Sequence, residues 1–295
     1  MMGISLIHAG GGLPPAPVRL LPNRTSSTPS RRTALPRGQV RRWQVTLKAV
    51  PDQRWSLSPV PAGIHSLISS WLHSSVLDPA GEAHHGPHTY AARWRRCSPD
   101  TVTITLHLFR DELSAVLVRR LFLGRAERLG QVALLVTAVE ELGATALTSL
   151  SGVPGTRWLL RFPSGVTFKR GDVFMPWPSP EAVLGSIRRR LVETWGWEPE
   201  AAVMREAVRA VAPIRTELTT RRWREGRGGR GRDVSLAVGE LEWVASGDEE
   251  IRAIVDLLLR AGELTGVGAR TTWGAGALEV TRPSSATRLQ KVVPG

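Results

Sequence analysis

Apolar and polar residues alternate along several short segments of this chain, the pattern of strands that bury one face. The clearest case is 101–109, where Val102, Ile104 and Leu106 fall on the same face. After Pro61 the apolar residues recur at intervals of three and four instead, which predicts a helix with one buried face. The order in this half is strand, helix, strand, strand, helix, strand, a ferredoxin-like unit. These elements are predicted at 41–50, from 61, and at 88–96, 101–109, 111–123 and 131–139.

A looser version of the same order is predicted in the second half. It begins with a strand at 157–162. Ser179 is expected to cap the next helix, with Pro180 at its first position and Gly196 after its end.

Two further strands, 214–224 and 233–245, can pair across an Arg/Gly run at 225–232. That run is either a mobile hairpin loop or a loop that contacts RNA. The residues Ser246 to Glu249 form a predicted capping box ahead of another helix. A last strand closes the unit.

We therefore expect an α+β protein with two tandem ferredoxin-like (RRM-like) domains, at 39–150 and 151–282. Residues 1–38 are rich in Pro, Gly, Ser, Thr and Arg and are expected to form a disordered basic arm. An upstream start-codon artefact and an RNA-binding arm are the alternatives for this segment. Residues 283–295 are expected to be a tail.

The charge of the chain narrows the choice of partner. Its formal net charge is +13, and lysine occurs only at Lys48, Lys169 and Lys291, so nearly all of the positive charge is arginine. A high-GC genome raises arginine content, but arginine also suits phosphate and stacked bases, so the excess favours a polyanionic partner. The single Cys97 fits a reducing cytosol and excludes an intramolecular disulfide. No apolar run reaches membrane-spanning length and the start does not resemble a signal peptide, so we expect a cytoplasmic protein without a membrane partner.

A glycine-rich stretch, 264–280, follows the last predicted helix. Glycines at this density allow positive φ and close approach to a ligand, and exposed N–H groups in such a loop can bind an anion. Arg270 adds a guanidinium fork that suits phosphate. A tight helix-to-strand turn is the alternative interpretation.

The chain lacks a phosphate-binding Walker loop, a nucleophile elbow and metal-ligand spacing, which leaves histidine chemistry on RNA. RNA carries its own nucleophile, the 2′-hydroxyl, and histidine can move the protons that its attack requires. His84, His85 and His88 cluster with the only tyrosine, Tyr90, in what can also be a chance group in a mobile loop. Among the other histidines, His65 is expected to pack in the core beside the apolar stripe of its helix. His107 lies on the polar face of its strand and is expected to be exposed there, with a contact to RNA as the alternative.

Three stretches together resemble the CRISPR repeat-processing endoribonucleases of the Cas6 family. They are the glycine-rich loop, the strand region Trp158–Lys169, and the segment Pro176–Leu191 with its helix. The resemblance implies a metal-independent enzyme that cuts CRISPR precursor RNA within each repeat, giving mature guide RNAs with a 2′,3′-cyclic phosphate and a 5′-hydroxyl. It implies no cofactor and no metal.

The resemblance also implies site residues. The family often places its catalytic histidine after the first helix, so His85 is the first candidate and His84 the second, with Tyr90 as a possible helper. No lysine follows His85, so His88 or Arg93 would have to replace the lysine that relatives often add. The expected RNA-binding residues are Gly266, Gly268, Arg270, Thr271, Gly274, Gly276, Lys169 and Arg93.

Two other functions stay open at this point. The first is a non-catalytic guide-RNA-binding subunit of a CRISPR interference complex, which needs the fold and charge but not the histidines. The second is a general RNA-binding structural protein, for example one associated with ribosomes. The expected partners are CRISPR precursor RNA and mature guide RNA, with other interference-complex subunits as further candidates.

Overall fold

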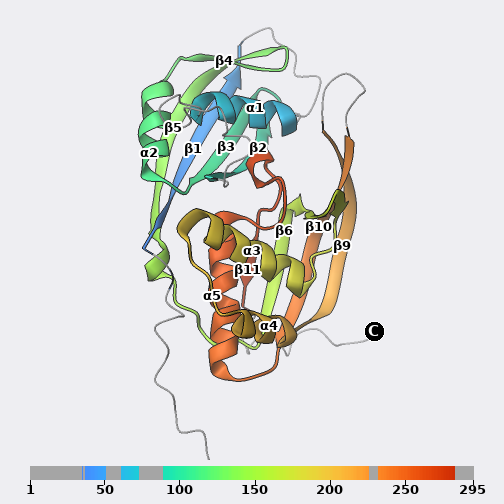
Figure 1. The fold of residues 1–295 in the computed structure, drawn as a ribbon. Coiled ribbons are helices and arrows are strands. Elements are labelled where there is room, and N and C mark those ends of the chain that lie inside the picture. The colour runs from blue at the N-terminus through green and yellow to red at the C-terminus, as the bar shows by residue number, and fades with distance from the viewer. Residues whose placement is uncertain (1–34, 36, 51–60, 73–88, 226–231, 283–295) are drawn as a thin grey trace, which may run out of the picture. The chain divides into compact units, whose positions relative to one another are not determined.

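The computed structural model describes residues 35, 37–50, 61–72, 89–225 and 232–282 (Figure 1). All of them belong to one compact body, residues 32–295, which contains both halves of the predicted fold. Most of the predicted arm at 1–38 and the whole tail at 283–295 lie outside the described residues. Leu35 is described, and only 6% of it is exposed, so the packed part of the chain includes this residue.

The first sheet has the expected ferredoxin-like order. Its strands follow the order β2-β3-β1-β5-β4, and all neighbours are antiparallel. Without β4, this is the fold's arrangement, in which the first and third strands lie side by side at the centre. The elements are β1 (Gln39–Ala49), α1 (Pro61–Leu72), β2 (Tyr90–Ser98), β3 (Thr101–Leu108), α2 (Asp111–Arg120), β4 (Ala126–Leu129) and β5 (Val132–Ala146).

Alternation and helical spacing both lead to one core in this half. Val45, Ile104 and Leu106 point to the same side of the central strands and are fully buried. Ile68 and Trp71 of α1 are also fully buried in this cluster. A helix of twelve residues cannot hold itself together in water, so this apolar contact is what stabilises α1.

The second sheet repeats the arrangement with the order β11-β6-β10-β9, again antiparallel. The protein therefore consists of two tandem ferredoxin-like units, and the boundary at residue 150 stays a prediction. The elements are β6 (Arg157–Val166), β7 (Phe168–Arg170), β8 (Val173–Met175), α3 (Pro180–Trp195), α4 (Ala201–Arg209), β9 (Val211–Glu225), β10 (Arg232–Ala245), α5 (Glu249–Thr265) and β11 (Glu279–Thr281), with short 3-10 turns at Leu147–Ser149 and Thr271–Trp273.

The signals predicted for α3 are confirmed. The Ser179 side chain accepts a hydrogen bond from the N–H of Ala182, and Gly196 ends the helix with a φ of 66°. The cap of α5 differs from the prediction, because Asp248 rather than Ser246 accepts the hydrogen bond from Ile251 N–H. Both residue types cap well, and the sequence alone does not decide between candidates two positions apart.

Three elements were not predicted: β4, α4 and the β7–β8 hairpin. Helix α4 starts at Ala201, and the residue before it, Glu200, makes no side-chain cap, so the helix lacks the usual start signal. Strands of three or four residues are too short to show alternation. The strand expected at 131–139 instead continues as β5 to Ala146, while the helix expected to reach residue 123 ends at Arg120.

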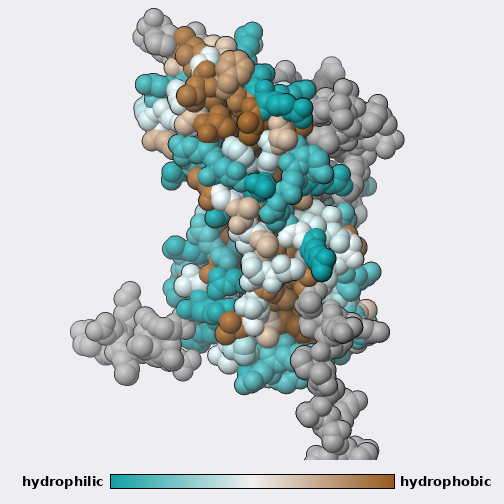
Figure 2. Space-filling model, turned by 90° about the vertical axis from the view of Figure 1, so that its left-hand side faces the viewer, coloured by the Kyte–Doolittle hydropathy of each residue, from teal (hydrophilic) through white to brown (hydrophobic). Residues whose placement is uncertain are grey.

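Helix α2 and the segment after it also present apolar side chains to solvent. Val118, Phe122 and Leu123 are 53%, 61% and 68% exposed. Figure 2 looks onto the side on which α2 lies in Figure 1 and shows an apolar area in its upper part. Among the described residues, no helix combines the length and apolar character needed to cross a membrane.

Candidate nucleic-acid interface

The glycine-rich loop joins the end of α5 to β11. Its four glycines, Gly266, Gly268, Gly274 and Gly276, all take positive φ, between 74° and 101°. Arg270 also does so, at 62°, the one non-glycine residue with positive φ in the described part of the chain. The loop therefore needs the backbone freedom that its composition predicts.

The glycines pack against the protein itself. A Cβ atom on Gly268 would lie 2.3 Å from the carbonyl oxygen of Thr167, and one on Gly276 would lie 2.0 Å from that of Val267. A Cβ on Gly274 would lie 2.4 Å from Nε1 of Trp94, a residue of β2. The glycines are therefore needed because the loop backbone lies close to other parts of this chain, rather than to a ligand.

The loop's N–H groups are largely used inside the protein as well. Ala269 N–H donates to the Thr167 carbonyl and Gly276 N–H to that of Gly165, both over 2.7 Å. Gly268 N–H donates to the Ser186 hydroxyl of α3 over 3.0 Å. The expectation that the N–H groups of this loop form an anion site is wrong for these residues, because the loop folds onto the end of β6 and uses its donors there.

A buried arginine of α3, Arg190, donates hydrogen bonds to the glycine-rich loop. Nη1 of Arg190 donates to the Thr265 carbonyl over 2.9 Å and to the Thr271 hydroxyl over 2.6 Å, and its Nη2 lies 3.3 Å from the Gly268 carbonyl oxygen. Burial lowers the pKa of Arg190 to about 10, so the guanidinium is still charged at neutral pH. Only 1% of Thr271 is exposed, which assigns its hydroxyl to this support rather than to a bound RNA.

The side chain of Arg270 lies in a stack of rings. Its guanidinium is 4.9 Å from the ring centroid of Trp273 and 5.2 Å from that of Phe174 in β8. On Trp273, the ring of His65 from α1 stacks at 5.0 Å with an interplanar angle of 15°. Such contacts between arginine and aromatic faces are each worth roughly 0.5–1 kcal/mol at exposed sites. The loop therefore joins α1 of the first unit to the β7–β8 hairpin of the second.

Tyr90 completes the contacts at His65. Its hydroxyl oxygen lies 3.2 Å from Nδ1 of His65, and the Thr272 carbonyl oxygen lies 3.3 Å from the same nitrogen. Burial raises the pKa of Tyr90 to about 12, so its hydroxyl keeps its proton at neutral pH. His65, a residue of α1, thus contacts β2 and the glycine-rich loop instead of packing in the core.

The loop and the fold around it match one protein family. Residues 160–278 match the family model described as CRISPR-associated endoribonuclease Cas6. A Cas6 solved as a product complex is 25% identical, with a TM-score of 0.67 over 82% of this chain and 99% of that chain. Residues 160–278 therefore resemble the Cas6 endoribonucleases, and most of the chain shares their fold.

Two further solved structures match this chain over similar lengths. A mutant Cas6 in which one histidine is replaced by alanine is 23% identical, with a TM-score of 0.65, and covers 83% of this chain and 99% of its own. The Cas6 of Thermus thermophilus is 18% identical, with a TM-score of 0.63 over the same shares. No curated protein sequence matches this one.

The histidines favoured by the Cas6 resemblance, His84 and His85, lie outside the described residues, as does His88. His107 is described, and the expectation of an exposed side chain is wrong. It is 4% exposed, and its Nδ1 lies 2.6 Å from the Leu264 carbonyl oxygen at the end of α5. The alternation of polar and apolar residues along β3 does not show whether its polar face is open to water or covered by α5.

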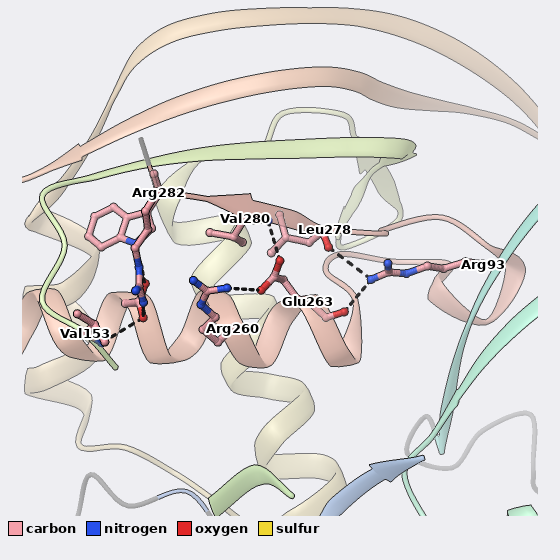
Figure 3. A network of polar contacts seen from close by, with 9 residues as sticks. Arg93, Val153, Arg260, Glu263, Leu278, Val280 and Arg282 are labelled. Carbon is pink, nitrogen blue, oxygen red and sulfur yellow. Dashed lines mark hydrogen bonds and ion pairs between the residues drawn. The ribbon is translucent and has the colours of Figure 1, made fainter. Parts of the chain in front are cut away.

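Arg93, which was expected to bind RNA, links the two ferredoxin-like units (Figure 3). Its Nη2 donates to the carbonyls of Glu263 and Leu278, over 2.7 Å and 3.4 Å. The carboxylate of Glu263 in turn accepts from Val280 N–H and pairs with Arg260 (Figure 3). Burial lowers the pKa of Arg93, with the charge of Glu279 acting in the opposite direction.

Lys169, the remaining predicted contact, is exposed in β7. Sequence reasoning did not single out Arg190 or predict the contacts of His65, because both depend on elements far apart in the chain. In the described part of the chain, no three His, Cys, Asp or Glu side chains come together as a metal site would require.

Proposed function

We propose that this protein is a Cas6 endoribonuclease that cuts CRISPR precursor RNA within its repeats to give mature guide RNAs. The observation that carries the proposal is the match of residues 160–278 to the Cas6 endoribonucleases, extended by the likeness of most of the chain to a Cas6 product complex. The net charge of +13 agrees with an RNA partner.

In the proposed reaction a base removes the proton of the 2′-hydroxyl, whose oxygen attacks the adjacent phosphorus. The bond to the 5′-oxygen breaks, and that oxygen takes up a proton from an acid. The products are a 2′,3′-cyclic phosphate and a 5′-hydroxyl, and no metal ion is needed. Proton transfers of this kind contribute roughly 10²–10⁴-fold to a rate.

We assign the proton transfer to His85, with His84 as the second candidate. Both belong to the segment between α1 and β2, two elements that meet at the contact between His65 and Tyr90. The strand that follows this segment, β2, therefore begins beside the glycine-rich loop. One of the matching Cas6 structures is a mutant of that protein in which a histidine is replaced by alanine. Because Tyr90 is buried and protonated, we assign it to positioning His65 rather than to proton abstraction.

Arg270 and Lys169 are the proposed contacts to the RNA backbone. The four glycines, Thr271 and Arg93 have a different proposed role, which is to hold the loop and the two units in place. Arg270→Ala is expected to lower the salt dependence of RNA binding by a slope of roughly one, if the guanidinium neutralises one phosphate.

The test is cleavage of labelled cognate repeat RNA by the full-length protein in excess EDTA. His85→Ala should abolish cleavage with little change in affinity, because a proton-transfer group acts mainly in the transition state. His73→Ala, at a histidine outside the cluster of His84, His85 and His88, is the matched control and should still cut. A 2′-deoxy nucleotide just before the scissile phosphate should block cleavage but not binding.

Other outcomes are equally clear. If only His84→Ala stops cleavage, the role moves by one position. Cleavage that ends in EDTA, or that continues on the deoxy substrate, excludes the proposed chemistry. A protein that binds the repeat tightly but never cuts it is a non-catalytic guide-RNA-binding subunit.

A further inference from the structure

A groove lies along α3 and is also lined by residues of the β7–β8 hairpin and of the glycine-rich loop. Its volume is about 470 Å³, within the roughly 300–1,000 Å³ of small-ligand sites. Ala182, Gly185 and Ser186 form one wall, and Arg189 continues it one turn further along the helix. A Cβ placed on Gly185 would meet no atom within 4 Å, so these small residues leave the groove open.

An exposed tryptophan, Trp177, also lines the groove. It follows the β7–β8 hairpin and is 49% exposed. Its two neighbours are Pro176 and Pro178, and its carbonyl oxygen accepts a hydrogen bond from Ser179 N–H over 3.0 Å. Prolines fix their own φ and restrict the residue before them, so this short segment is rigid. A large indole is thus held at the groove without being used in the core.

The charges around the groove favour an anionic ligand. Lys169, Arg170 and Arg189 line it and are exposed, against the two exposed carboxylates of Glu181 and Glu193. The start of α3, a helix of sixteen residues, lies at one end, where the helix dipole favours negative charge. An aromatic face, cations and a helix start side by side suit a molecule that has both a flat ring and a phosphate.

We propose that this groove binds an unpaired nucleotide of an RNA strand, with the base stacked on Trp177 and the phosphate beside Lys169 and Arg170. The base must be unpaired, because in a duplex both of its faces are covered by its neighbours. The choice of RNA over another nucleotide-bearing molecule rests on the proposed function. The groove adds to it a second contact, distant in the chain from the histidines.

The experiment measures binding of the full-length protein to a labelled decaadenylate by fluorescence anisotropy, with a blunt twenty-pair RNA duplex measured in the same salt. Removal of a stacking residue costs roughly five- to 150-fold in affinity. Trp177→Ala should show a loss in that range for decaadenylate and almost none for the duplex. Trp177→Phe should retain most of the affinity, since it keeps an aromatic face. Phe122→Ala, which removes an exposed aromatic ring after α2, is the matched control and should bind like the unchanged protein.

A second measurement locates the contact without relying on a loss of affinity. Irradiation of the unchanged protein with a decanucleotide that contains 4-thiouridine should give a cross-linked peptide that includes Trp177. Unchanged affinity in Trp177→Ala, an equal loss for the duplex, or cross-links elsewhere only would each overturn the proposal. If Trp177→Ala does not fold, Trp177→Phe and the cross-link decide.

The outcome is separable from that of the proposed function. A protein that binds decaadenylate through Trp177 but does not cut repeat RNA retains the groove and loses the nuclease activity. A protein that cuts repeat RNA while Trp177→Ala binds decaadenylate normally retains the nuclease and loses the groove.

Discussion

The imidazole of His107 faces the end of α5, where the carbonyl oxygen of Leu264 lies 2.6 Å from its Nδ1. Since a carbonyl can only accept, the neutral ring carries its proton on this nitrogen. Burial, followed by the nearby charge of Arg93, lowers the pKa of His107 to about 4, from an ordinary value near 6.5. The folded protein therefore resists a proton that the unfolded chain accepts.

From this we predict a loss of stability on acidification. Above pH 6.5 neither state is protonated at His107, and the stability is fully present. Between pH 6.5 and 4 only the unfolded chain gains the proton, so the free energy of unfolding should fall, by up to about 3 kcal/mol. Urea unfolding at pH 7, 6, 5 and 4 measures the slope, and His107→Gln should flatten it. Identical slopes in both proteins would contradict the assignment.

Gly274 and Gly124 allow a second prediction at the residue scale, about space rather than charge. Both have positive φ, at 101° and 81°, but only Gly274 has a neighbour in the way, Trp94 of β2. Alanine at either position should cost roughly 1–2 kcal/mol of backbone strain. Gly274→Ala should lose roughly 1–3 kcal/mol more, because the methyl group must displace Trp94. Chemical denaturation of the two variants compares them, and equal losses would contradict the packing explanation.

At the scale of elements, the start of α5 gives two alternative caps. The Asp248 carboxylate accepts from Ile251 N–H over 2.9 Å, whereas the Ser246 hydroxyl donates to the Ala210 carbonyl over 3.3 Å at an exposed site. Asp248→Ala should therefore cost roughly 1 kcal/mol of stability, the usual value for a lost cap. Ser246→Ala should cost clearly less. Thermal unfolding of both variants distinguishes the caps, and the reverse order of losses would restore the sequence-based assignment.

The elements that the sequence predicts well are those that carry their own signals. Alternation located the central strands, and Ser179 and Gly196 located both ends of α3, because each signal is local. Helix α4 has no side-chain cap, and the β7–β8 hairpin is too short for a pattern, so both were missed.

The site was harder to predict than the fold. The glycine spacing correctly indicated a loop with positive φ, but not that its donors and the side chain of Thr271 turn inwards. That depends on Arg190 and β6, which are far away in the sequence. In the same way, nothing near Arg93 in the chain indicates that it reaches the carbonyls at the end of α5.

At the scale of the whole molecule, Arg93 joins the two ferredoxin-like units through Glu263 and Leu278. Arg93→Met keeps the apolar stem of the side chain but leaves two carbonyl groups without this donor. We predict that the two units then unfold less cooperatively. Calorimetry should show a van't Hoff enthalpy below the calorimetric one, or two transitions. Arg95→Met, at an exposed position of the same strand, should retain the original transition. A single sharp transition in both variants would show that other contacts suffice.

The position of β11 has a consequence for how the protein is made. This strand covers one edge of β6, its partner from far earlier in the sequence, and its Val280 is buried. A chain leaves the ribosome from its N-terminus, so β6 is synthesised long before the strand that closes its edge. A premature stop codon before residue 279 would release a chain with most of both cores but with that edge open, and open edges invite pairing between chains. Nonsense mutations late in the gene should therefore act by causing aggregation, even where every residue discussed for RNA has already been translated.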